Sequence, residues 1–168
     1  MNVDTKNMLT IGALEKSKAL CDSPEDKSEL GSIQSMLKEA ELFVLSHSWC
    51  HEIIERFYDR GVSGVVGIFF FRIKASEGSG ADEELWVIVG DVPSAYIDTI
   101  ECPNGACALD AYIQAMGEWV THVKKGDSID DLIPVNVEPS LEYADMLQSR
   151  LELLNTHFLS NYKDELEE

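Results

Sequence analysis

Basic residues are scarce in this chain. Its 168 residues include 13 Lys and Arg against 31 Asp and Glu, which gives a formal net charge of −18. Because Lys and Arg neutralise the phosphates of nucleic acids and anionic lipids, this balance predicts no nucleic-acid partner and no membrane partner. The excess of acidic over basic side chains is large in residues 101–168, which contain 14 acidic and 4 basic side chains. A basic partner protein would be attracted there, although such charge can also serve solubility alone.

Long apolar runs and a secretory leader are missing as well. The longest apolar run, Val65–Phe71, is far shorter than the roughly 20 residues needed to span a bilayer. Charged residues interrupt positions 1–20, so we expect no export signal and no membrane anchor. Four cysteines in such a chain are expected to be thiols in a reducing, cytoplasmic compartment: Cys21, Cys50, Cys102 and Cys107.

The sequence shows no internal repeat, low-complexity tract or Pro- and Gly-rich linker, which predicts a single domain over residues 1–168. Apolar residues make up 45% of the chain, a composition typical of globular proteins. Residues 1–22 are only weakly patterned, and we expect them to form a loosely attached N-terminal segment.

Apolar spacing predicts several helices. The first begins at Pro24, with Ser23 as its cap, and a second carries Trp49, Ile53 and Phe57 and ends at Gly61. A third follows a cap at Asn104 and closes at Gly126, and a last one begins near Pro139 and Ser140. The apolar seam of the last helix is typical of core packing, although a homodimer through this helix is an alternative. The seam consists of Ala144, Leu147, Leu151, Leu154 and Phe158.

Two other segments predict strands. Val65–Phe71 is β-branched and aromatic on both faces, which is typical of a central strand, and Leu85–Val89 is a second buried strand after a polar loop. A third strand is expected at residues 96–101 or 133–137, because two strands are rarely stable alone. Since strands do not alternate with helices, we predict an α+β fold with a small antiparallel sheet of two to four strands and four to five helices.

Reactive side chains are densest at His47–His51. On a helix, His47 and His51 would share one face, the spacing at which two imidazoles reach one metal ion. Cys102 and Cys107, on either side of a turn, could supply two thiolates, so a Cys2His2 zinc site can be drawn. The alternative, solvent-facing histidines and small buried thiols, is common and is preferred here, so no metal is expected.

Cys50 is also a weak nucleophile candidate. His51 would point elsewhere on a helix and is a poor base, so only His122 or His157 could serve after folding. The chain has no nucleophile elbow, phosphate-binding loop or paired-histidine metalloprotease motif. We therefore expect no cofactor and lean against an enzyme.

Gly90-Asp91-Val92-Pro93 is a turn directly after a buried strand. Gly90 permits a close backbone approach, and Asp91 can accept hydrogen bonds from the turn's own amides or contact a ligand. The first role is usual, so Asp91→Ala is expected to destabilise the fold by on the order of 1 kcal/mol. Tyr96 can fold back over this turn.

The segment Trp86–Tyr96 reads Trp-Val-x-x-Gly-Asp-x-Pro-x-x-Tyr, and Trp49-Cys50 precedes it. With the Ala108–Tyr112 helix that follows, these residues resemble an uncharacterised family of bacterial proteins over residues 46–125. The resemblance implies a bacterial origin and a small α+β domain, and it implies no activity.

Two functional hypotheses remain. The first is a non-enzymatic acidic module that binds a basic protein, in the manner of bacterial immunity or inhibitor proteins, with Asp91, Tyr96 and Trp49 as binding residues. The second is an enzyme or metal-binding protein built around Cys50, His47 and His51.

Overall fold

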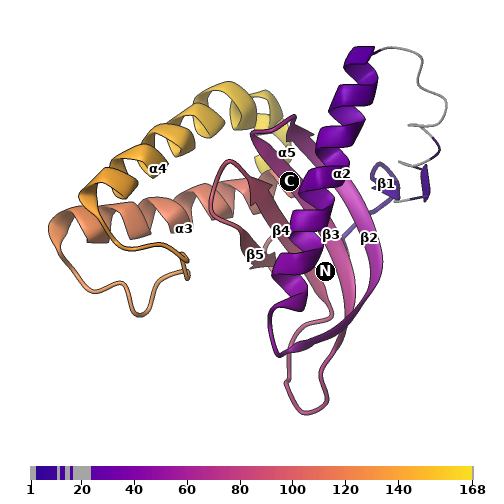
Figure 1. Ribbon diagram of the computed structural model, residues 1–168, viewed down its shortest axis with the longest axis horizontal. Helices are drawn as coiled ribbons and strands as arrows, with labels where there is room; N and C mark the ends of the chain where they lie inside the picture. Colours follow the sequence, from indigo (N-terminus) through magenta and orange to yellow (C-terminus); the bar gives the residue numbers. More distant parts are fainter. Residues whose placement is uncertain (1–2, 11, 14–15, 17–23, 168) are drawn as a thin grey trace.

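The computed structural model describes residues 3–10, 12–13, 16 and 24–167 and shows a five-stranded antiparallel sheet between helices (Figure 1). This confirms the α+β class and the antiparallel sheet, with more strands and fewer long helices than expected. The strands follow chain order across the sheet: β1 (Leu9–Thr10), β2 (Cys50–Val62), β3 (Val66–Ala75), β4 (Glu84–Gly90) and β5 (Ala95–Asp98). The long helices are α2 (Pro24–Leu45), α3 (Gly105–Lys125) and α4 (Leu141–Leu153).

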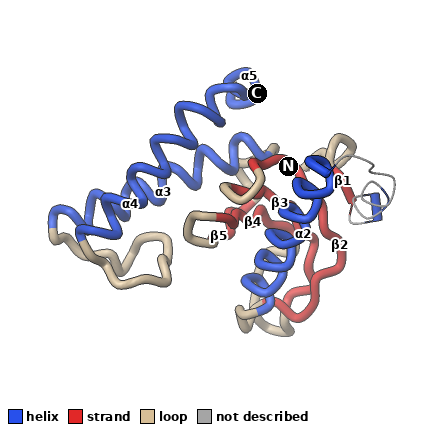
Figure 2. The backbone as a smooth tube through the Cα atoms, turned by 45° about the horizontal axis from the view of Figure 1, so that its top comes forward, coloured by secondary structure: helices blue, strands red, loops and turns tan. Residues whose placement is uncertain are grey.

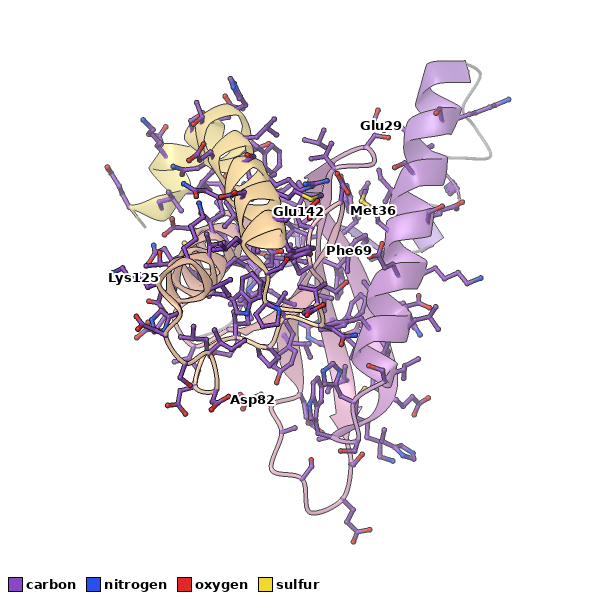
Figure 3. All side chains as sticks on the ribbon, turned by 60° about the vertical axis from the view of Figure 1, so that its left-hand side comes forward. Glu29, Met36, Phe69, Asp82, Lys125 and Glu142 are labelled. Carbon is purple, nitrogen blue, oxygen red and sulfur yellow. The ribbon has the colours of Figure 1, made fainter. Side chains whose placement is uncertain are left out.

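Helix α2 covers one face of the sheet. It begins at Pro24 as predicted, while the proposed cap Ser23 lies outside the described residues. Figure 3 shows Met36 of α2 directed at the sheet, where it belongs to the same buried cluster as Phe69 of β3. The cluster joins the apolar face of α2 to alternate residues of β3 and β4.

Helices α3 and α4 lie side by side over the other face (Figure 2). Asn104 caps α3 by accepting a hydrogen bond from the Cys107 amide, and Gly126 closes it in the left-handed conformation, both as predicted. Phe70 and Trp86, from β3 and β4, belong to the buried cluster on this face. The central strands are therefore apolar on both sides, as predicted, because each side is covered by helices.

The predicted helix around Ile53 and Phe57 is wrong, because this segment is β2. The pairing of β2 with β3 shifts register at three places, between Cys50 and Glu52, Ile53 and Glu55, and Tyr58 and Arg60. Such bulges insert extra residues, so buried positions recur at three and four residues and imitate a helix. On a helix Ile53 and Phe57 would share one face, whereas here they belong to clusters on opposite faces of the sheet.

Three further predictions concern the third strand, the start of α4 and the apolar seam of the last helix. The third strand is β5, near the first predicted position, while residues 133–137 contain no strand. Ser140 caps α4, as its predicted start requires. The apolar seam of the last helix is buried, which confirms core packing, and a π-helical turn at Leu154–Phe158 replaces its last part. The homodimer through this helix stays a prediction.

The N-terminal segment is described only in part. Val3 is buried in the core and β1 pairs with β2, so residues 3–10 are attached to the sheet. Residues 17–22, which the loose-segment prediction also covers, lie outside the described residues. Within the described part of the chain, no helix combines the length and apolar character needed to cross a membrane.

Candidate functional site

Four rings gather where α2 meets β5. This aromatic cluster consists of Phe43, His47, Trp49 and Tyr96. The centroid of Tyr96 lies 5.0 Å from that of Trp49 and 5.4 Å from that of His47. Although tightly packed, the cluster is not closed over, because Tyr96 is 42% exposed and Trp49 is half-buried. Trp49 and Tyr96 are two of the residues predicted to bind a partner, and their rings are in contact.

The histidine of the cluster has a defined tautomer when neutral. His47 Nδ1 lies 2.8 Å from the Phe43 carbonyl oxygen. Because a carbonyl oxygen only accepts, Nδ1 carries the proton and donates, which leaves Nε2 as an acceptor. His47 is thereby oriented by the helix it follows.

A groove runs along the open edge of β5. Its cavity of about 840 Å³ lies between β5 and the segment 129–137 of the loop that joins α3 to α4, and Figure 2 shows that loop beside β5. The groove, called here the β5 groove, extends over both layers of the molecule: Phe43 and His47 line it from the α2 layer, and Trp119 and Tyr143 from the α3 and α4 layer. Its volume is in the range of ligand sites, about 300–1,000 Å³.

A second cavity, of about 310 Å³, shares Tyr96 with the first. Trp49 and Tyr96 line it together with three acidic residues, Asp82, Glu84 and Asp98, of which Glu84 directs its carboxylate to Arg72 on the other face of the sheet. Tyr96 and Asp98 lie opposite Val87 and Leu85 on β4, both members of the buried cluster under α2, so this cavity opens on the α2 face. It is called here the Trp49–Tyr96 pocket.

The turn after β4 is held by all three long helices. Tyr112 of α3 donates a hydrogen bond to the Pro93 carbonyl oxygen (2.6 Å), and Ser94 donates to Glu39 of α2 (3.4 Å). Asp91 forms an ion pair with Arg150 of α4, with 3.1 Å between Oδ2 and Nε. Burial raises the pKa of Tyr112, so this hydroxyl stays a donor over the whole physiological range.

Asp91 is therefore placed differently from both sequence-based roles. Its hydrogen-bond partner in the described structure is the Arg150 guanidinium, where turn amides were expected. It lines neither cavity that contains Tyr96 and borders a smaller one, of about 260 Å³, beside Arg150. Its role as a binding residue gains no support from this position.

The ion pair sets the expected effect of Asp91→Ala. The Asp91 side chain is 66% exposed and that of Arg150 is 35% exposed, and exposed pairs contribute about 0.2–1 kcal/mol. We expect the variant to lose no more than about 1 kcal/mol of unfolding free energy, and the difference to shrink in 1 M NaCl. Thermal melts at low and high salt measure it, with Arg150→Ala as the matched variant. A melting temperature at or above the wild-type value would instead make Asp91 a leading site residue.

The zinc site drawn from the sequence is not assembled. His47 follows α2 whereas His51 lies on β2, so the two do not share a helical face. Cys102 and Cys107 are at the start of α3, and Cys102 belongs to the cluster on the opposite face from Cys50. Among the described residues, no three His, Cys, Asp or Glu side chains could hold a metal ion together.

Cys50 does not have the surroundings of an activated nucleophile. It is buried under α2, and burial raises the pKa of its thiol, the opposite of what a thiolate needs. His122 donates through Nδ1 to the Ser128 carbonyl oxygen at the end of α3, across the sheet from Cys50. His157 lies in the π-helical turn after α4, and His51 is exposed on β2.

Several lining residues were missed by sequence analysis. Phe43 stands one helical turn before His47, a spacing that could have indicated their contact. Asp98 alternates with Tyr96 along β5 and so shares its face. Asp82 and the segment 129–137 lie in loops, where residue pattern gives no position in space.

Comparisons of the chain with protein families, with curated proteins and with solved structures found no match. The resemblance to an uncharacterised bacterial family therefore stays a prediction.

Proposed function

We propose that this chain is a non-enzymatic acidic module that binds a basic segment of a partner protein, in the manner of immunity or inhibitor proteins. The observation that carries the proposal is the partly exposed aromatic cluster at the junction of two cavities, one of which has three acidic residues in its lining. Aromatic rings that are half-exposed and rigidly packed are the usual anchors of protein interfaces.

Charge supports the same proposal. The two cavities that share Tyr96 are lined by four acidic residues, Asp130 in the β5 groove and three in the Trp49–Tyr96 pocket, and by no Lys or Arg among the described residues. All four arginines of the chain form ion pairs with its own carboxylates. The remaining acidic excess faces solvent and would attract and orient a basic partner.

The backbone of β5 suits an extended segment. It is the last strand of the sheet, and none of the hydrogen bonds of the described residues joins its outer edge to the facing segment 129–137. An unpaired edge that opens on a groove is the geometry of strand addition, in which main-chain hydrogen bonds supply affinity.

The proposal predicts a salt-dependent partner that is lost when the charge of the groove is reversed. The test variant is Asp82→Lys with Asp130→Lys, both exposed and with no hydrogen bond or ion pair from another described residue to their carboxylates. The control is Glu118→Lys with Asp164→Lys, which changes net charge equally but lies outside both cavities. Pull-down from cells at about 50 mM and 500 mM NaCl compares the three proteins.

We expect wild type and control to capture the same basic protein at low salt only, and the groove variant to lose at least about tenfold of it, equivalent to roughly 1.4 kcal/mol. Equal capture by the groove variant and the control, or no partner at either salt concentration, would show that this face is not a docking site for a basic protein.

A further inference from the structure

We infer that the Trp49–Tyr96 pocket receives one arginine side chain of the partner segment, so that arginine is the residue the site selects. This inference rests on the proposed function and gives it a recognition rule. It comes from the residues that the pocket combines: two aromatic rings, the two aspartates Asp82 and Asp98 and, among its described lining, no cation.

The rings provide faces for a guanidinium group. Trp49 and Tyr96 meet at an interplanar angle of 66°, so they form two walls of a corner rather than a closed stack. His47 packs against both rings and Phe43 packs against Tyr96, and these contacts hold the two rings in position. A planar guanidinium stacks on aromatic faces and prefers tryptophan and tyrosine, and no arginine of the chain stacks on these two rings.

The carboxylates provide the counter-charge at one side of this corner. Glu84 already pairs with Arg72, at 3.1 Å, and one oxygen of Asp98 accepts the Ile100 amide. Asp82, which Figure 3 labels, lies in the loop between β3 and β4. It is exposed and pairs with no described cation. Asp82 and the second oxygen of Asp98 thus have no cation among the described residues, and a guanidinium binds such carboxylates through its forked N–H donors.

The size and position of the pocket fit one long side chain. Its volume of about 310 Å³ is at the small end of ligand sites, too small for a folded element. It adjoins the β5 groove through Tyr96 itself. An extended segment beside β5 directs alternate side chains to the α2 face, where the pocket opens, so one of them reaches it.

Calorimetry with defined probes tests the inference. The probe is the peptide acetyl-Val-Thr-Arg-Thr-Val-amide, and its control carries citrulline, which has nearly the same shape but no charge, in place of arginine. We expect the arginine peptide to bind at least about tenfold more tightly at low salt, and Tyr96→Ala to remove most of that difference. Tyr96→Phe, which keeps the ring, should retain it.

A matched pair of charge variants locates the cation. Asp82→Asn should weaken the arginine peptide by about threefold to tenfold, whereas Asp164→Asn, which is exposed and outside both cavities, should change it by less than about twofold. Equal binding of the arginine and citrulline peptides, or an unchanged preference in Tyr96→Ala, would overturn the inference. The proposed function fails differently, through loss of salt-dependent partner capture, so the two results are separable.

Discussion

Gly90→Ala is expected to lower the free energy of unfolding by about 3 kcal/mol or more, although the substitution removes no contact. Gly90 has a φ of 133°, a conformation that side chains rarely adopt. An added Cβ would lie 2.8 Å from the Val65 carbonyl carbon and 2.9 Å from the Val66 Cα, both backbone atoms at the start of the neighbouring strand β3. Those atoms cannot move aside, because Val66 pairs with Gly90 and the Asp91 amide bonds to Val65.

Urea denaturation and thermal melts measure this effect, which corresponds to a decrease in melting temperature of roughly 6–12 °C for a domain of this size. Gly117→Ala is the control: it lies within α3, and nothing is within 4 Å of its added Cβ. It should gain up to about 1 kcal/mol, because alanine favours the helix. If the two variants behaved alike, the close approach at Gly90 would have no energetic role.

Two apolar runs in the sequence were sufficient to predict the two central strands of the sheet. Val65–Phe71 and Leu85–Val89 are apolar at consecutive positions, and only a strand covered on both faces can bury them all. Phe69 and Phe70 are fully buried in clusters on opposite faces, which is what the run requires. The close backbone approach at Gly90 was also predicted, since the chain must leave this core abruptly.

Strand β2 could not be predicted because its partner decides it. Taken alone, Trp49, Ile53 and Phe57 have the spacing of a helix face. Pairing with β3 supplies hydrogen bonds along most of the segment, and the bulges that reconcile it with β3 are invisible in one strand's sequence. The spacing of apolar residues within one segment therefore predicts its secondary structure only weakly where pairing with another strand competes with helix formation.

The candidate site was predicted in part for a similar reason. Trp49 and Tyr96 were predicted as binding residues, and their aromatic type favours such a role. Their convergence with Asp82 and Asp98 depends on the β4–β5 register, and the outer wall of the groove depends on the path of a loop. Neither the register nor the loop path has a signature in residue types.

Arg60→Met is expected to cost about 3–5 kcal/mol at pH 7, because it removes the cation from a buried network. Arg60 donates to both oxygens of Glu165, at 3.1 and 2.7 Å, and to Asp59 at 2.5 Å. Its guanidinium also lies 4.4 Å from the ring centroid of Tyr162. This network connects the C-terminal turn to β2, and the Asp59 side chain is only 10% exposed, so without Arg60 its charge has no partner and little water.

The loss should depend on pH with a defined sign. Burial raises the pKa of the Asp59 carboxyl, and the neighbouring Arg60 guanidinium opposes that rise. Removing Arg60 therefore raises the pKa of Asp59 in the folded state further. A carboxyl with a raised pKa takes up its proton in the folded state first, so stability decreases as pH rises through that pKa. The variant's deficit should therefore be larger at pH 8 than at pH 5, and adding Asp59→Asn should recover part of it at pH 7.

A matched arginine separates this effect from the loss of any ion pair. Arg72 of β3 also contacts two carboxylates, Glu55 and Glu84, but its side chain is 34% exposed. Arg72→Met should cost about 1 kcal/mol or less from these pairs, with little change between pH 5 and pH 8. Urea denaturation of both variants at the two pH values makes the comparison. Equal losses, or a deficit of Arg60→Met that is the same at both pH values, would contradict the view that Arg60 neutralises a buried carboxylate.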